Sequence, residues 1–427
     1  MRRPLLAALA LTAAAGGVRA QGLGDPLLTA TISQSAVADS NYTLDDPSPG
    51  TSYYADTRLL LGLLSQTPTQ TFELGLDTGL RALWQAEEDF DFTFASPSTA
   101  TLGYAQEWAG AEVGADLRYR QTEVDSDRPL EDFDDEFPDA LDRTDVEVTE
   151  RRYDGSFTLD LATDSPSSYS FSADGTRIDY DDTSTDLVPR TFAQGEAMWQ
   201  LRVTPVLSAA LLGAYYYYDA ENVQETEIRT GEIDAGVIYE PSDVLRLDVG
   251  LGYADRSKRE FQGGERVYDD RSGLVVRGAL RYEFDDVVVN ASARYTDSAV
   301  GSPFSGFVRA TYPLPRGEIS GQIFQRKGGA TTGGETDVTG AIIGVEHEIN
   351  TISALSFDFS ASRQKDRSEP IEPDITRMDF TAAYSRALTE VVAANIGYRY
   401  RTYDQDPDDA DSNSVFFEIA RTFQTRP

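Results

Sequence analysis

The feature that most constrains the fold of this chain is a two-residue alternation of apolar and polar side chains along many long segments. In residues 244–253, Leu, Val and Tyr occupy every second position from Leu245 to Tyr253, and Arg246, Asp248 and two glycines lie between them. A period of two places the two sets on opposite faces of a β-strand. No segment combines a sustained helical period with helix caps, so we expect an all-β chain. Similar alternation recurs in residues 72–82, 111–120, 153–161, 274–284 and 392–401.

The length of these strands favours a membrane-spanning barrel over a soluble β-fold. A soluble sandwich or propeller would show the same alternation. The predicted strands are about ten to fifteen residues long, whereas strands usually have five or six. One face is apolar, and the other carries Gly and charges of both signs, which suits lipid on one side and water on the other. We therefore predict a transmembrane antiparallel up-and-down β-barrel, whose closure pairs every backbone group as a membrane interior requires.

The connections between the predicted strands alternate between short and long. The short set consists of residues 67–70, 164–167, 204–206, 240–243, 285–286, 313–317, 350–353 and 387–390. The long, mostly acidic set consists of residues 39–53, 85–97, 123–147, 182–189, 219–225, 255–267, 327–336, 366–373 and 404–412. Short periplasmic turns and long extracellular loops are typical of outer-membrane barrels. Counting the predicted hairpins on this pattern gives about 18 to 20 strands.

Charge and cysteine content exclude several classes of protein. The chain has 427 residues, with 72 Asp and Glu against 37 Lys and Arg, a formal charge of -35 and no Cys. A nucleic-acid binder needs basic surface to displace counterions from phosphate, so we expect no nucleic-acid partner. Disulfide frameworks and cysteine metal sites are excluded as well. A mean hydropathy of -0.39 excludes a bundle of transmembrane helices, because each such helix needs about 20 mainly apolar residues.

The N-terminus has the pattern of a secretory signal peptide. Arg2 and Arg3 form a short basic region, residues 4–15 are apolar, and small residues lead to a Val-x-Ala cleavage site at Ala20. A transmembrane anchor is the alternative, but the apolar core is too short for a stable span. We predict that residues 1–20 are a signal peptide cleaved after Ala20, and that residues 21–427 form a single barrel domain in the outer membrane. Cleavage removes three arginines and no acid, which takes the formal charge from -35 to -38.

Aromatic side chains are concentrated at the ends of the predicted strands. Amphipathic rings favour the headgroup level of a membrane, so we interpret them as two aromatic girdles; packing in a soluble core is the alternative. Near the long loops they are Tyr119, Tyr215–Tyr218, Tyr253, Tyr295 and Tyr403, and near the short turns Trp199, Tyr239, Tyr282, Phe284 and Tyr312.

The first and final strands resemble those of known outer-membrane barrels. Residues 29–35, 39–42, 54–67 and 71–80 resemble the start of the β-barrel porin family 2, a group of proteobacterial outer-membrane proteins. The resemblance implies a porin-like barrel, with some members similar to exopolysaccharide-export proteins, and it implies no catalytic residues. Residues 414–423 resemble the C-terminal signal that such barrels present to the barrel assembly machinery. Arg421 interrupts the apolar face of that strand, although at a membrane rim its cation can reach the headgroups. The apolar face consists of Val415, Phe417, Ile419 and Phe423.

We find no constellation of residues for catalysis, and we predict a protein that is not an enzyme and has no cofactor. His347 is the only histidine. Alternation with Ile343, Val345 and Ile349 places it on the outward face near the short turns, where it cannot serve as a base at the loop end. The Gly-x-Ser-x-Gly motif of hydrolases does not occur.

Two acidic runs are candidates for binding divalent cations. Residues 123–147 contain twelve carboxylates, and residues 404–411 contain five Asp. Ca²⁺ and Mg²⁺ prefer oxygen ligands of this kind, but the second run is not an EF-hand loop, because Asp409 stands where Gly is needed. Two interpretations stay open: solvated acidic loops, or loose cation bridges to lipopolysaccharide phosphates. The candidate ligands of the second run are Asp404, Asp406, Asp408 and Asp409.

Charged residues on the polar face of the predicted strands are candidates for lining a pore. Rings of such residues set the charge preference of a solute pathway. Pairs of Arg and carboxylate that only keep the lumen rigid are an equal alternative. The candidates are Arg58, Arg81, Arg118, Arg120, Arg246, Arg277, Arg281, Arg399 and Arg401, together with Glu73, Asp77, Glu112, Asp116, Asp248 and Glu283.

From these features we expect a porin-like passive channel for small hydrophilic solutes, in contact with outer-membrane lipid and lipopolysaccharide. The alternatives are a conduit for exopolysaccharide export and a structural barrel without an open pore. An acidic lining would repel an anionic polymer, which favours the small-solute channel. An energised receptor is disfavoured, because we expect no plug before the first strand. The sequence leaves the solute open, and a monomer and a trimer are both compatible with it.

Overall fold

The structure of this chain, a computed structural model, is built from strands. It describes residues 26–86, 90–95, 97–123, 148–181, 187–262, 264–297, 304–329, 335–366, 374–405 and 408–425. Within these ranges no helix is long and apolar enough to cross a membrane. The predicted signal peptide, residues 1–20, lies outside them. The strands are β1 (Leu27–Asp39), β2 (Ser52–Thr67), β3 (Gln70–Trp84), β4 (Phe90–Phe94), β5 (Ser98–Trp108), β6 (Ala111–Glu123), β7 (Thr149–Leu161), β8 (Ser167–Tyr180), β9 (Arg190–Thr204), β10 (Leu207–Ala220), β11 (Thr226–Ser242), β12 (Leu245–Gln262), β13 (Glu265–Phe284), β14 (Val287–Thr296), β15 (Phe304–Leu314), β16 (Gly317–Gly329), β17 (Glu335–Asn350), β18 (Ser353–Asp366), β19 (Ile375–Ala387), β20 (Val392–Gln405) and β21 (Asp408–Thr425).

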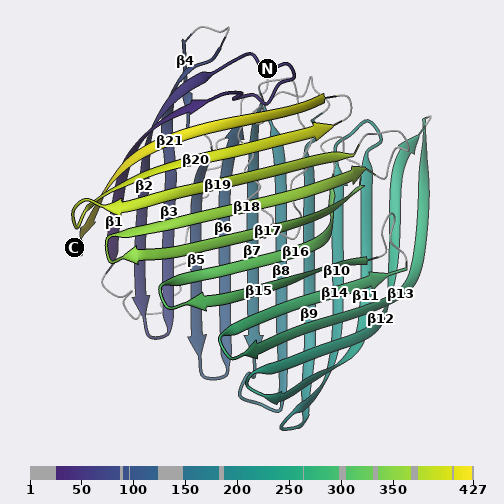
Figure 1. Cartoon of the computed structure of the whole chain (residues 1–427). Helices are drawn as coiled ribbons and strands as arrows, with labels where there is room; N and C mark the ends of the chain where they lie inside the picture. The colour runs from purple at the N-terminus through teal and green to yellow at the C-terminus, as the bar shows by residue number, and fades with distance from the viewer. Residues whose placement is uncertain are drawn as a thin grey trace, which may run out of the picture.

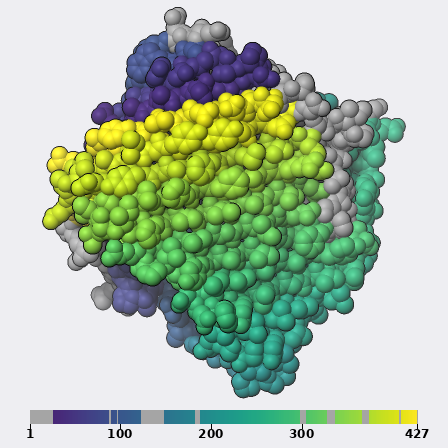
Figure 2. Space-filling model, in the orientation of Figure 1, coloured from purple at the N-terminus to yellow at the C-terminus, as the bar shows by residue number. Residues whose placement is uncertain are grey.

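The strands form one closed antiparallel barrel. Consecutive strands pair with each other except β4 and β5, and β1 pairs with β21 from Asp39 opposite Ser414 to Leu28 opposite Thr425. β4 pairs with residues 80–84 of β3 and β5 with residues 70–77, so β4 and β5 together occupy one position in a 20-strand barrel. In Figure 1, β16–β21 pass in front of β5–β9. Figure 2 shows the closure as the last strand, in yellow, lying against the first strands, in purple. The prediction of an all-β barrel is confirmed.

The alternation of the sequence becomes an outward and an inward face. On β12, Val249 and Leu251 point outward and are 48% and 58% exposed, whereas Asp248 points inward and pairs with Arg277 of β13. β-Branched and aromatic side chains suit this pleated surface. A soluble monomer rarely exposes an apolar surface of this extent, but a barrel in a bilayer presents such a band to lipid.

The short turns follow the prediction, and the long loops follow it in part. Thr67 pairs with Gln70 and Phe284 with Val287 across two-residue turns. Residues 255–267 were predicted as a loop, which is wrong: β12 and β13 stay paired up to Gln262 opposite Glu265. Continued pairing satisfies the backbone groups of both strands, and a Gly with a φ of +93° at position 264 permits the tight turn between them. Much of the predicted loop 404–412 is likewise paired, as part of β20 and β21.

The two aromatic girdles are present, with three exceptions. Outward rings near the long loops include Tyr215 and Tyr253, and those near the short turns include Trp199 and Phe284. The prediction is wrong for three side chains that strand parity turns inward, because position near a strand end does not determine the face. These are Tyr216, Tyr218 and Tyr403.

The final strand keeps its apolar outward face. Val415, Phe417 and Phe423 are exposed on it. The guanidinium of Arg421 lies over the ring of Phe423, 4.7 Å from its centroid. This cation–π contact accommodates the charge of Arg421 among these apolar side chains.

Candidate functional site in the barrel lumen

All of the predicted lining residues lie at inward positions of their strands. The structure gathers them into separate groups with other inward residues rather than into one ring. Their part in a solute pathway stays a prediction. They are Arg58 of β2; Glu73, Asp77 and Arg81 of β3; Glu112, Asp116, Arg118 and Arg120 of β6; Arg246 and Asp248 of β12; Arg277, Arg281 and Glu283 of β13; and Arg399 and Arg401 of β20.

One group joins three strands through Arg277. Its Nε donates to both carboxylate oxygens of Asp234 at 3.0 and 2.9 Å, and its Nη1 donates to Asp248 at 3.0 Å. Asp234 is on β11, so the guanidinium of this β13 residue reaches across β12. A Cβ on Gly250 of β12 would come within 2.7 Å of the Arg277 Nε. The glycine on the polar face therefore leaves room for an ion pair between strands that are not neighbours.

A second group runs from β14 to β9. Arg294 of β14 forms an ion pair with Glu232 of β11 and donates to the Tyr216 hydroxyl of β10 at 3.2 Å. That hydroxyl donates to Glu196 of β9 at 3.1 Å. Sequence reasoning did not place these residues together. The parity of Tyr216 within the run of four tyrosines was the signal that could have found it.

At the end of the barrel with the long loops, residues 40–51 fold into the lumen. The Tyr42 side chain is 2% exposed. Arg81 of β3 donates to its hydroxyl at 2.9 Å and to both oxygens of Asp56 at 2.8 and 2.9 Å. Arg401 of β20 donates to Asp39 at 2.9 Å and to the Tyr42 carbonyl at 3.3 Å. We call residues 40–51 the inward loop, because charged side chains of two walls hold it inside the barrel.

Apolar side chains also lie inside this mouth, which the sequence reasoning missed. Leu44 of the inward loop is buried with Phe324, Val338 and Ile375 on the inward faces of β16, β17 and β19. On the other side, Leu187 is buried with Ile178 and Tyr180 of β8 and with Val148, which directly precedes β7. Local breaks in the alternation near strand ends were the available signal. The mouth is therefore narrowed by packed side chains rather than by charge alone.

Two polar cavities lie in the lumen. The larger, of about 760 Å³, adjoins the inward loop through Tyr54, whose ring centroid is 5.5 Å from that of Tyr42. The smaller has about 480 Å³. Between them the lining side chains include eight carboxylates and five guanidinium groups, an excess of acid that favours cations. They are Asp56, Arg58, Arg309, Asp358, Asp379, Arg399 and Glu418 in the larger cavity and Glu73, Asp116, Arg118, Arg152, Asp154 and Asp174 in the smaller.

His347 lies at an outward position of β17, opposite Leu355 near the short turns, as the alternation predicted. Asp404 and Asp409 are partners across the β20–β21 ladder. Asp406 and the side chain of Asp408 lie outside the described residues. Among the described residues, no group of three or more His, Asp or Glu is arranged to hold a metal ion.

Comparisons with known proteins identify the type of fold. No protein-family model matches the chain, and no curated protein matches it. The solved structure of the ferric-catecholate import receptor Fiu from E. coli K12 is 7% identical, with a TM-score of 0.51 over 94% of this chain and 82% of that chain. The siderophore receptor PiuA from Acinetobacter baumannii is 8% identical, with a TM-score of 0.50 and the same coverage. The chain thus has the fold of a large outer-membrane β-barrel, and its resemblance to porin family 2 stays a prediction.

Proposed function

We propose that this protein is a passive diffusion channel of the outer membrane for small hydrophilic solutes, with a preference for cations. The observation that carries the proposal is the polar lumen, whose two cavities are lined by more carboxylates than guanidinium groups. Transport requires only diffusion past fixed charges, so the protein acts without chemistry or a cofactor. The long loops face the outside and the short turns face the periplasm.

The inward loop sets the size limit of this channel. It narrows the mouth next to the larger cavity, and hydrogen bonds that Arg81 and Arg401 donate to Tyr42 keep it in place. The acidic excess attracts cations into the lumen at low ionic strength, when charges are screened least. An anionic polymer would meet repulsion there, which disfavours export of an acidic polysaccharide.

Conductance of the purified protein in a planar bilayer tests the proposal. We expect discrete steps, and a reversal potential in a salt gradient that indicates cation preference and approaches zero at high ionic strength. The absence of steps in every salt would leave a structural barrel without an open pore. Conductance steps would favour the polysaccharide conduit if a deletion strain takes up solutes normally but has lost its capsule. The two similar barrels are an import receptor and a siderophore receptor, so saturable uptake of one larger ligand is a further outcome, and it would contradict passive diffusion.

A further inference from the structure

The wall of the larger cavity carries a row of apolar side chains between two polar rows. Val37 of β1 lies opposite Tyr54 of β2 on one side and opposite Phe416 of β21 on the other, and all three residues line the cavity of about 760 Å³. We call them the apolar row. Neighbouring strands are about 4.8 Å apart, so the apolar row extends about 10 Å across the wall. Inside a polar lumen, it favours a solute that has an apolar face of its own.

The ring of Phe416 extends along the wall rather than across the lumen. A Cβ on Gly397 of β20 would come within 2.2 Å of its Cζ and 2.6 Å of its Cε1, so the outer part of the ring rests on the backbone at this glycine. Only a glycine leaves room for this placement. The rest of the ring lines the cavity and offers a flat apolar surface on which a solute ring can stack.

The rows on both sides of the apolar row carry hydroxyl and charged groups. Toward the short turns, Ser35 lies between Asp56 of β2 and Glu418 of β21. Toward the long loops, Ser414 of β21 lies opposite Arg399 of β20. All five residues line the same cavity. The cavity therefore offers hydrogen-bonding groups along both edges of an apolar strip, which suits a ligand with an apolar face and a polar rim.

The charges of this cavity largely compensate each other. Its lining includes four carboxylates and three guanidinium groups, whereas the lining of the smaller cavity includes four and two, so most of the acidic excess lies in the smaller one. Arg399 donates to Asp379 at 3.0 and 3.2 Å, and Asp56 accepts from Arg81 at 2.8 and 2.9 Å. A paired carboxylate still has lone pairs that accept from a hydroxyl group, and a guanidinium has five N–H donors. Such pairs bind neutral hydroxyl groups without being separated, whereas an ionic ligand has to compete with the existing partner.

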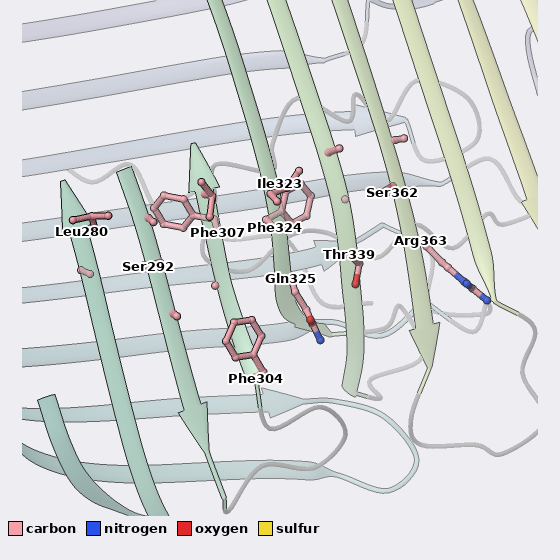
Figure 3. A pocket seen from close by; sticks show the side chains of 18 of the residues that line it. Leu280, Ser292, Phe304, Phe307, Ile323, Phe324, Gln325, Thr339, Ser362 and Arg363 are labelled. Carbon is pink, nitrogen blue, oxygen red and sulfur yellow. The ribbon is translucent and has the colours of Figure 1, made fainter. Parts of the chain in front are cut away.

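The groove on the outward face of the barrel has a different character. It has about 950 Å³ over β13–β19, and exposed apolar side chains such as Phe304 and Ile323 line it (Figure 3). Its outward position turns it to the bilayer rather than to the solute pathway. The polar cavity is therefore the place for a hydrophilic ligand.

We propose that the larger cavity is a subsite for a short neutral oligosaccharide. A pyranose ring has an apolar face of C–H groups and a rim of hydroxyl groups, so it stacks on the apolar row while its hydroxyls bond with the polar rows. The apolar row is longer than one such ring, and the cavity volume lies in the usual range of ligand pockets, about 300–1,000 Å³. The inference rests on the proposed function and deepens it, because it names the class of solute that the channel binds.

Block of the single-channel current in planar bilayers tests the proposal. We expect maltotriose or cellotriose to reduce the wild-type current in a saturable way, and the acyclic polyol sorbitol, which has hydroxyl groups but no ring, to have no such effect. Phe416→Leu keeps an apolar side chain without the aromatic ring and should weaken the block about tenfold. Phe417→Leu is the matched control, because Phe417 points outward from the same strand and is 45% exposed. Heat-modifiable migration shows whether each variant is folded, and the comparison of solutes on the wild type decides the proposal even if Phe416→Leu is not.

The outcomes separate the subsite from the channel. Saturable block by a trisaccharide that Phe416→Leu weakens and Phe417→Leu leaves unchanged supports the subsite. Conductance steps without block by either trisaccharide, or equal block in both variants, overturn the subsite and leave the channel intact. Stronger block by choline or glycine betaine than by the trisaccharides overturns it too, in favour of a cation or a zwitterion. A barrel that never conducts but binds a trisaccharide in isothermal titration, more weakly in Phe416→Leu, contradicts the channel and leaves the subsite intact.

Discussion

Replacing Arg81 with alanine should both destabilise the barrel and loosen its mouth. The Arg81 and Asp56 side chains are 4% and 8% exposed, and the Arg81 guanidinium also lies 4.3 Å from the ring centroid of Tyr54. Arg81→Ala leaves the Asp56 carboxylate buried without this partner, which typically costs about 3–5 kcal/mol. It also removes the hydrogen bond that holds the Tyr42 hydroxyl. We therefore expect the inward loop to leave the lumen for part of the time.

Two measurements check this expectation. Equilibrium unfolding in urea should show the loss of stability, and Arg246→Ala is the matched control. Arg246 pairs with Glu240, with side chains 48% and 41% exposed, so its loss should cost only about 0–1 kcal/mol. The double variant Arg81→Ala, Asp56→Ala should be less destabilised than the sum of the single variants, because no unpaired carboxylate remains. In planar bilayers, Arg81→Ala should show larger or more variable steps. A cost equal to that of the control, together with wild-type conductance, would refute the reasoning about the inward loop.

Three further substitutions probe the lumen. Leu44→Ala removes a buried apolar side chain. We expect the free energy of unfolding to fall by about 2–5 kcal/mol and the conductance to rise. An unaltered conductance would show that Leu44 does not narrow the mouth. Arg399→Ala removes the Nε that donates to both oxygens of the cavity carboxylate of Asp379, at 3.2 and 3.0 Å. The reversal potential should then shift toward greater cation preference at low salt and return to the wild-type value at about 1 M salt. The absence of a shift would place this pair outside the ion path. Gly250→Val puts a side chain against Arg277, and unfolding measurements should show a loss of about 1–3 kcal/mol, whereas wild-type stability would mean that the β11–β13 ion pair can shift at no cost.

The strand pattern was predictable because its cause is local. Alternation fixes which side of a strand a residue faces, so the inward position of Arg277 and the outward position of His347 followed from parity alone. The ends of the strands could not be predicted from parity, because the β12–β13 hairpin continues where the composition indicated a loop. Pairing with a neighbour decides how far a strand runs, and that neighbour is set by the whole barrel.

The partners of the lumen charges could not be derived from the sequence. Arg277 finds Asp234 across β12 because a glycine lies between them, and this depends on the stagger of three strands. Leu44 could equally be an exposed loop residue, because only the closed barrel offers inward apolar side chains of β16, β17 and β19 to cover it.

The sequence by itself determined the strands, their apolar and polar faces and the acidic balance of the chain, since each depends on residue type and a period of two. Only the tertiary structure decided that the inward loop enters the lumen, that Arg277 meets Asp234 across β12, and that Leu44 is covered by apolar side chains of β16, β17 and β19. These features depend on register between strands, and register is fixed only when the first strand pairs with the last and the barrel closes.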